Sequence, residues 1–318
     1  GSQAGDALTH ADFNVAVGMG SLTSDTLGSK SVAVGTFALL AQNFTTDTDS
    51  HNTAVGNDAG KGITTGVQNT LIGSSAGDAM TDADHNVAVG LNSLGTNVLG
   101  SKSTAVGTGA LATQNPATAI NMYNVAVGYD AGVSVTTGQS NTLIGSLAGD
   151  ALTTPASNTA VGQNALGADT QGSNTTAIGA GALQAQNFTT ATESYNTAVG
   201  TYAGASVTTG QYNTLIGRAS GDAITVGNSN TAVGQNALGA DTKGDLNTAI
   251  GIGALQSQNF TTTTDSYNTA VGGFAGGNVT TGTNNTLVGG LAGNAITTGV
   301  QNTLIGSLSG DALDVGNT

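Results

Sequence analysis

Aspartates recur at a fixed spacing in this chain, and they are the first candidates for metal chemistry. The motif Ala/Ser-Gly-Asp-Ala occurs repeatedly, and its first four aspartates are evenly spaced. They are Asp6, Asp78, Asp150 and Asp222, and Asp311 follows in the same motif. Calcium requires roughly six to eight oxygen ligands, and a single carboxylate per repeat supplies too few. We therefore expect no metal site, and we expect each aspartate to stabilise a turn by bonding to its local backbone.

The histidines and glycine strings do not indicate catalysis. His10, His51 and His85 have no spacing that would join them to a serine and a carboxylate, and the chain has no cysteine. A catalytic triad or a zinc centre is therefore not expected. The Gly-x-x-Gly strings do not stand between a strand and a helix, as a phosphate-binding loop requires. We predict no enzymatic activity and no cofactor.

Composition restricts the partners. Nineteen acidic and five basic residues give a formal net charge of −14. Nucleic acids and anionic membranes attract clustered Lys and Arg, so neither is an expected partner. No apolar run is long enough to span a bilayer, and we expect no membrane contact in this segment. Without cysteine, no disulfide framework is formed.

The elements that position these residues are repeats. The glycine that closes a Val-Gly, Ile-Gly or equivalent step recurs after one short step, one long step and two short steps, and this superperiod restarts at Gly18, Gly90, Gly162 and Gly234. Regular self-similarity of this kind predicts one repeat array over residues 1–318 rather than two globular domains. Because the array begins and ends without a capping segment, we expect it to be part of a longer fibre.

Each coil, from one closing glycine to the next, is expected to contain one short strand. The segment Asn52-Thr53-Ala54-Val55-Gly56 is typical of the repeat. The short coil has too few residues for a helix-turn-helix unit, and β-branched residues beside the glycine favour a strand. The sequence therefore predicts an all-β fold, a parallel β-solenoid. The closing glycine should adopt a positive φ at a tight bend.

The two faces of this strand carry different residues. Because side chains alternate, Thr53 and Val55 share one face and Asn52 and Ala54 share the other. We expect the Val/Ile column to line the interior of the coil, so that replacing Ile144 by Asp would unfold the local stack. The Ala/Leu column would then need to be covered by another chain, which predicts a homo-oligomer, most simply a trimer.

Asparagine at the start of the strand predicts a ladder. Amides stacked from coil to coil can hydrogen bond to one another along the stack. The ladder positions are Asn52, Asn69, Asn124, Asn141, Asn196, Asn213, Asn268 and Asn285.

The pattern Asn-Thr-Ala-Val-Gly-x-x-Ala-Gly/Leu, followed by Thr-Thr-Gly and the next Asn-Thr-Leu-Ile-Gly, resembles the head repeats of YadA-like trimeric autotransporter adhesins. It is also similar to repeats of phage tail fibres. The resemblance covers essentially the whole chain and implies a left-handed β-roll, with three chains intertwined side by side as a homotrimeric fibre. The chain departs from that family in its longer coils, and within residues 1–318 we expect no anchor, coiled-coil stalk or terminal chaperone.

Every fourth coil is longer than the others, and more than half of the aromatic residues fall in these long coils. One interpretation is a contact surface for a receptor or glycan, with aromatic anchors and a polar rim. The other is that each loop folds over its own coils and the aromatics cap an apolar gap. The candidate contact residues are Phe44, Asp47, Asp49, His51, Tyr123, Phe188, Glu193, Tyr195, Phe260, Asp265 and Tyr267.

These observations predict the shaft of an extracellular trimeric fibre, an adhesin or a phage tail fibre, that projects a host- or surface-binding tip from a cell surface or virion. A self-assembling extracellular filament is an alternative, and an ice-binding solenoid is another. Ice binding by solenoids uses regular Thr arrays, and here the strand Thr column is interrupted by Val15, Val32, Val87 and Val125. Such interruptions are typical of a packed position rather than of a solvated one.

Overall fold

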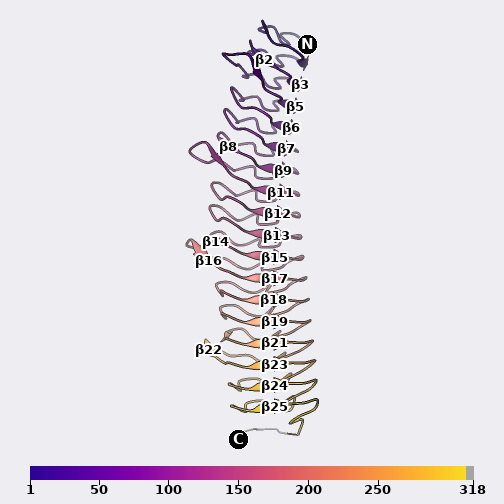
Figure 1. The fold of residues 1–318 in the computed structure, drawn as a ribbon, viewed down its shortest axis with the longest axis vertical. Helices are drawn as coiled ribbons and strands as arrows, with labels where there is room; N and C mark the ends of the chain where they lie inside the picture. Colours follow the sequence, from indigo (N-terminus) through magenta and orange to yellow (C-terminus); the bar gives the residue numbers. More distant parts are fainter. Residues whose placement is uncertain (313–318) are drawn as a thin grey trace. The chain divides into compact units, whose positions relative to one another are not determined.

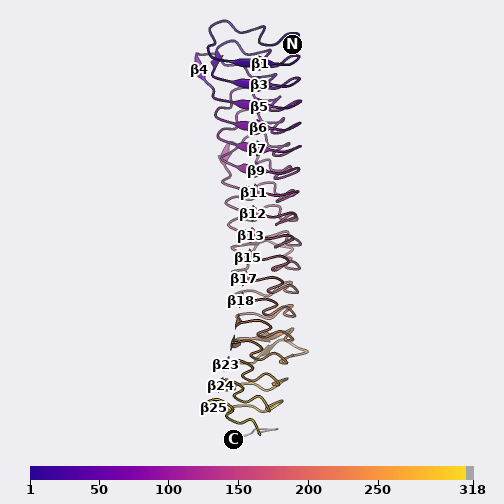
Figure 2. The ribbon, with the colours of Figure 1, turned by 90° about the vertical axis from the view of Figure 1, so that its right-hand side faces the viewer.

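The computed structural model describes residues 1–312, and in this range it consists of strands and turns without a helix. The chain divides into two compact units, Gly1–Ser157 and Asn158–Thr318. In each unit every coil contributes one three-residue strand to a parallel sheet, and the strands lie one above the next (Figures 1 and 2). The predicted all-β parallel solenoid is therefore confirmed.

The sheet strands begin with Val or Thr and end with Val or Ile. In the first unit they are β1 (Val15–Val17), β3 (Val32–Val34), β5 (Thr53–Val55), β6 (Thr70–Ile72), β7 (Val87–Val89), β9 (Thr104–Val106), β11 (Val125–Val127) and β12 (Thr142–Ile144). In the second unit they are β13 (Thr159–Val161), β15 (Thr176–Ile178), β17 (Thr197–Val199), β18 (Thr214–Ile216), β19 (Thr231–Val233), β21 (Thr248–Ile250), β23 (Thr269–Val271), β24 (Thr286–Val288) and β25 (Thr303–Ile305). Equivalent residues pair in register, for example Thr53 with Thr70.

Each long coil adds a second, two-residue strand that pairs with the coil before it. These parallel pairs lie beside the main column of strands, as Figure 1 shows for β8, β14 and β16. In the first unit they are β2 (Gly28–Ser29) with β4 (Thr48–Asp49) and β8 (Gly100–Ser101) with β10 (Ile120–Asn121). In the second they are β14 (Gly172–Ser173) with β16 (Thr192–Glu193) and β20 (Gly244–Asp245) with β22 (Thr264–Asp265).

The structure reverses the two expected faces of the main strand. Leu143 is fully buried within its own chain, whereas the neighbouring Ile144 is 39% exposed. The central residue is fully buried in every main strand from β3 to β24, including Ala54 beside the exposed Val55. The expectation that Val and Ile line the interior was therefore wrong. The argument that a partner must cover the Ala/Leu column is removed with it, because the coil covers that column itself.

Complementary side-chain sizes explain why Ala and Leu face inward. Strands with a central Leu face glycines in the adjoining turns, and a Cβ added at Gly60 would come within 2.7 Å of Leu71 Cδ1. In other coils, such as those of Ala33 and Ala88, the strand has Ala and the turn after it carries a buried Leu, Leu39 or Leu94. Large and small residues thus alternate across a thin interior and fill it to the density of a folded core.

Two features, one of the backbone and one of the side chains, hold successive coils close together. Gly56 has φ of 141°, and a Cβ there would overlap the carbonyl oxygen of Gly73 in the next coil. Beside it the asparagines form a ladder: Asn69 N donates to Asn52 Oδ1 at 2.9 Å, and Asn52 Nδ2 donates to the Gly66 carbonyl at 2.7 Å. The side chains of the ladder are buried, so these bonds satisfy polar groups that would otherwise be costly inside.

Candidate functional surfaces

A buried polar network fixes each long coil onto the coil before it. Asp169 Oδ1 accepts hydrogen bonds from the backbone N–H of Gly172 and of Phe188, at 2.9 and 3.2 Å. Its Oδ2 accepts one from Gln186 Nε2 at 2.6 Å. Gln186 Oε1 in turn accepts from Asn196 of the ladder at 2.8 Å. Asp25 with Gln42 and Asp241 with Gln258 form the same pair.

The second long coil uses different residues for the same task. Asn97 stands where the others have Asp, and among residues 1–312 its side chain hydrogen bonds only to Gly100, accepting from the backbone N–H and donating to the carbonyl. Gln114 Nε2 is consequently left without a hydrogen-bond partner among the described residues. Pro116 replaces the phenylalanine, and the fully buried Met122 lies against Gly100 instead.

The aromatic candidates of the long coils separate into two groups. Phe188 is 5% exposed and its ring lies beside Gly172, and Phe44 and Phe260 are buried in the same way. These rings therefore close the long coil over its own interior. Tyr195 is 47% exposed, and Tyr123 and Tyr267 are similarly open.

The exposed tyrosines bond to the polar residue two positions earlier. Tyr195 Oη donates to Glu193, Tyr267 Oη donates to Asp265 at 3.4 Å, and Tyr123 Oη accepts from Asn121 at 3.2 Å. The carboxylate of Glu193 raises the pKa of the Tyr195 hydroxyl, because the neutral hydroxyl is the donor.

The first long coil carries charged residues at the same place. Asp49 forms an exposed ion pair with Lys30 at 2.6 Å, and this bond lowers the pKa of the Asp49 carboxyl. His51 occupies the tyrosine position and Asp47 is exposed on the preceding turn.

Tyr212 also belongs to this group of exposed tyrosines, although it was not among the residues expected from the sequence. It stacks on Tyr195 with the ring centroids 5.5 Å apart. Tyr212 lies in a short coil, so attention to the long coils alone passes over it. The signal was present in the sequence, because both tyrosines stand at the same place relative to the closing glycine of their coil.

The outer face of the main sheet is a regular surface in each unit. It presents two columns, one of Thr and Val and one of Val and Ile, and none of the main-sheet strands contains a charged residue. In the second unit all nine strands begin with Thr, and every interruption of the Thr column lies in the first unit. Ile178, Ile216 and Ile250 are each more than a third exposed.

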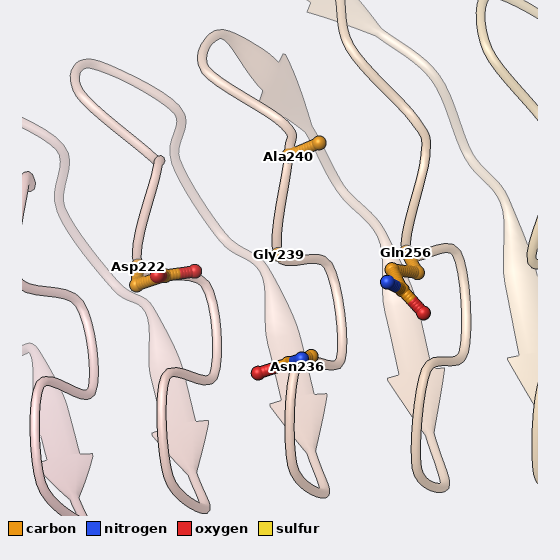
Figure 3. Close-up of a pocket in the computed structure, with 5 residues that line it drawn as sticks. All are labelled: Asp222, Asn236, Gly239, Ala240 and Gln256. Carbon is orange, nitrogen blue, oxygen red and sulfur yellow. The ribbon is translucent and has the colours of Figure 1, made fainter.

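A pocket of about 220 Å³ opens at the turn that follows the strand in the second unit (Figure 3). It is lined by Asp222, Asn236, Gly239, Ala240 and Gln256, which come from three successive coils. The side chains of Asp222 and Gln256 lie on either side of Gly239, whose missing side chain forms the gap between them (Figure 3). None of these residues except Asp222 was singled out from the sequence.

Burial raises the pKa of several aspartates. Desolvation raises the pKa of Asp169 and Asp241, although hydrogen bonds from glutamine and from backbone N–H groups oppose it. Desolvation also raises the pKa of Asp78, and the backbone N–H groups of Asp78 and Ala79 partly offset it. In the same motif, Asp150 Oδ1 is buried without a hydrogen-bond partner among residues 1–312, so the turn-stabilising role expected for this motif stays a prediction.

Within residues 1–312, no three His, Asp or Glu side chains lie close enough to hold a metal ion. Nor does that part of the chain contain a helix long and apolar enough to cross a membrane. Comparisons with protein-family models, with curated proteins and with solved structures give no match for this chain.

Proposed function

We propose that this chain is a structural shaft of an extracellular fibre, in which copies pack side by side through the Thr and Val/Ile columns of the main sheet. The outer sheet face supports this proposal: it is uncharged, repeats on every coil and leaves isoleucines exposed in a single chain. Contiguous apolar surface of this kind marks an interaction site. A cyclic trimer would cover the face of every copy and leave none open.

The shaft carries its tip or anchor outside this array. Repeats that contact only their neighbours extend without a new folding problem, so length is easily adjusted. Such a shaft would hold a binding tip away from a cell or virion, with no enzymatic step. The main sheet face, and not the Ala/Leu column, is the contact between chains.

Light scattering on the folded chain tests this proposal. A mass of three times 30.7 kDa is expected. Replacing Ile178 and Ile216 together by Lys should give a folded monomer, because lysines would then face one another across the interface. The matched control replaces Thr209 and Thr281, exposed residues on the Thr-Thr-Gly turns, by Lys and should remain trimeric. The proposal would be overturned if the wild-type chain were monomeric while its circular dichroism spectrum showed folded β-structure.

Ice binding is a second candidate, and the Thr column of the second unit favours it. Nine successive strands present Thr outward without interruption, each beside a Val or Ile. Strands spaced by about 4.8 Å repeat the hydroxyl and methyl groups regularly along the stack. The interruptions that argued against ice binding are confined to the first unit.

Thermal hysteresis distinguishes the second candidate from the first. An ice-binding face gives a gap between melting and freezing points that disappears when Thr214 and Thr231 are replaced by Tyr. A shaft whose sheet face is covered by other copies gives no gap. Measured with the mass of the same sample, the absence of hysteresis in a monomer would exclude ice binding as well.

A further inference from the structure

One glycine, Gly239, creates a recess in the second unit that no fold requirement explains by itself. Gly239 leaves the space between Asp222 and Gln256 that forms the pocket (Figure 3). Its φ lies outside the left-handed region, and a Cβ there would approach only the backbone of Asn236, at 3.1 Å. A side chain could therefore stand at this position, and the space it would fill is open.

An exposed aromatic ring lies close to Gln256, one of the residues that line this recess. The ring of Phe274 lies over Gly253, where a Cβ would come 2.6 Å from the ring carbon Cδ1 and 2.9 Å from Gln256 Oε1. Gln256 therefore adjoins both the ring and the pocket. Phe274 remains 45% exposed, and it adopts a positive φ of 55°, which is unfavourable for a bulky residue. Folding alone would favour Asn or Gly at this position.

The polar groups of the recess are open to a ligand. Asn236 and Gln256 form no side-chain hydrogen bond within residues 1–312. Together they offer two amide donor groups and two carbonyl acceptors, and Asp222 adds carboxylate acceptors. Arg218 is the nearby cation, and its charge opposes the rise that burial imposes on the pKa of Asp222.

Much of this arrangement occurs a second time, one superperiod earlier in the same unit. The ring of Tyr202 lies over Gly181, where a Cβ would be 2.6 Å from the ring and 3.0 Å from Gln184 Oε1. Asn164 occupies the place of Asn236 and lies 3.4 Å from Gln184 Oε1, to which it donates. Ring, glycine, glutamine and asparagine thus occur together in two successive superperiods of the second unit.

The chemistry of these groups restricts the ligand. A metal ion would need more carboxylates than the one present. An anion would meet Asp222 in a chain of formal charge −14. A flat apolar ring beside amide and carboxylate groups suits a ligand with one apolar face and a rim of hydroxyls. The volume of about 220 Å³ is below the roughly 300–1,000 Å³ of pockets for drug-sized ligands, so a single ring is the appropriate size.

We propose that the recess lined by Asp222, Asn236, Gly239, Ala240 and Gln256, together with the ring of Phe274 beside Gln256, binds one neutral pyranose unit of a glycan, and that the related arrangement at Tyr202 is a second site. Phe274 stacks on the apolar face of the sugar, and the amides and the carboxylate bond to its hydroxyls. The sites use the corner after the strand and not the sheet face, so this inference does not depend on the proposed shaft assembly.

Saturation-transfer NMR on the intact chain provides the test, with methyl β-glucoside, methyl β-galactoside and methyl α-mannoside as probes. At least one should receive saturation on its ring protons. Replacing Phe274 and Tyr202 together by Ala should weaken binding roughly tenfold, because each site loses a stacking aromatic. Ala240→Gln should block the pocket at Phe274 and leave the site at Tyr202 intact, so about half of the signal should remain.

Leu291→Ala is the matched control. Leu291 stands two residues after its closing glycine, as Phe274 does, but in the next coil, and it is 37% exposed. It should bind as the wild type does. The proposal is overturned if none of the three glycosides gives a signal with the wild-type chain, or if the double variant binds as strongly as Leu291→Ala. Stronger binding of methyl glucuronide, an anion, would also contradict it. The mass of the assembly is measured separately, so failure here leaves the shaft proposal unaffected.

Discussion

At the scale of single residues, the decisive question is which side chain of each strand points inward. Both alternating columns are apolar, so hydrophobicity alone does not distinguish them. Leu143 and Ile144 differ by one position, and only the contact of Leu with glycines on the facing turns places Leu inside. That contact joins residues of different coils. It could have been sought in the sequence, because each strand with a central Leu is flanked by coils with Gly in the turn.

We therefore predict opposite outcomes for two neighbouring substitutions. Leu143→Asp places an unpaired carboxylate in a fully buried column and should destabilise the chain by several kcal/mol. Ile144→Asp, on the half-exposed column, should change the stability of an isolated chain by about 1 kcal/mol or less. Urea unfolding followed by circular dichroism measures both.

The Ile144 substitution also separates folding from assembly. In a side-by-side trimer it should lower the assembly mass while leaving the single chain folded. Equal destabilisation by the two substitutions in a monomeric sample would mean that the inward face is assigned wrongly.

At the scale of elements, the coil and its strand could be predicted from the glycine spacing and from the β-branched residues beside it. The interior of the long coil could not. Asp169 and Gln186 are polar and lie in successive coils, and they share a buried column with apolar residues such as Val207 and Ile224. Sequence reasoning treats such polar residues as surface, because buried carboxylates are rare unless several hydrogen bonds satisfy them.

The phenylalanine of the long coil gives a prediction at this scale. Phe188→Ala should cost about 3–5 kcal/mol locally, because a nearly fully buried ring is lost over Gly172 and Asp169. Tyr195→Ala removes an exposed ring from the same coil and should cost about 1 kcal/mol or less. Hydrogen exchange should show faster opening around residues 172–194 for the first variant only. Equal exchange in both variants would assign the ring no role in closing the coil.

At the scale of the whole molecule, acidic residues greatly outnumber basic ones. The formal net charge is −14, and burial raises the pKa of Asp78, Asp150, Asp169, Asp222 and Asp241. Repulsion between like charges opposes the folded state and weakens when carboxylates are protonated. Both the repulsion and the raised pKa values make the folded state more stable at lower pH, and both recur along the regular array.

Stability should accordingly increase as the pH falls from 7 toward 4. A carboxyl whose pKa is raised in the folded state binds its proton more tightly there than in the unfolded chain, where the ordinary value is about 3.9. The stability it contributes is complete below that value and is lost as the pH rises through the raised pKa. We expect the melting temperature to rise on acidification through this window. The variant Asp169→Asn with Asp241→Asn should respond less, since Asn97 already occupies the equivalent position without a charge. A melting temperature that falls steadily with acidification, equally in both proteins, would show that carboxylates stabilise this fold in their ionised form.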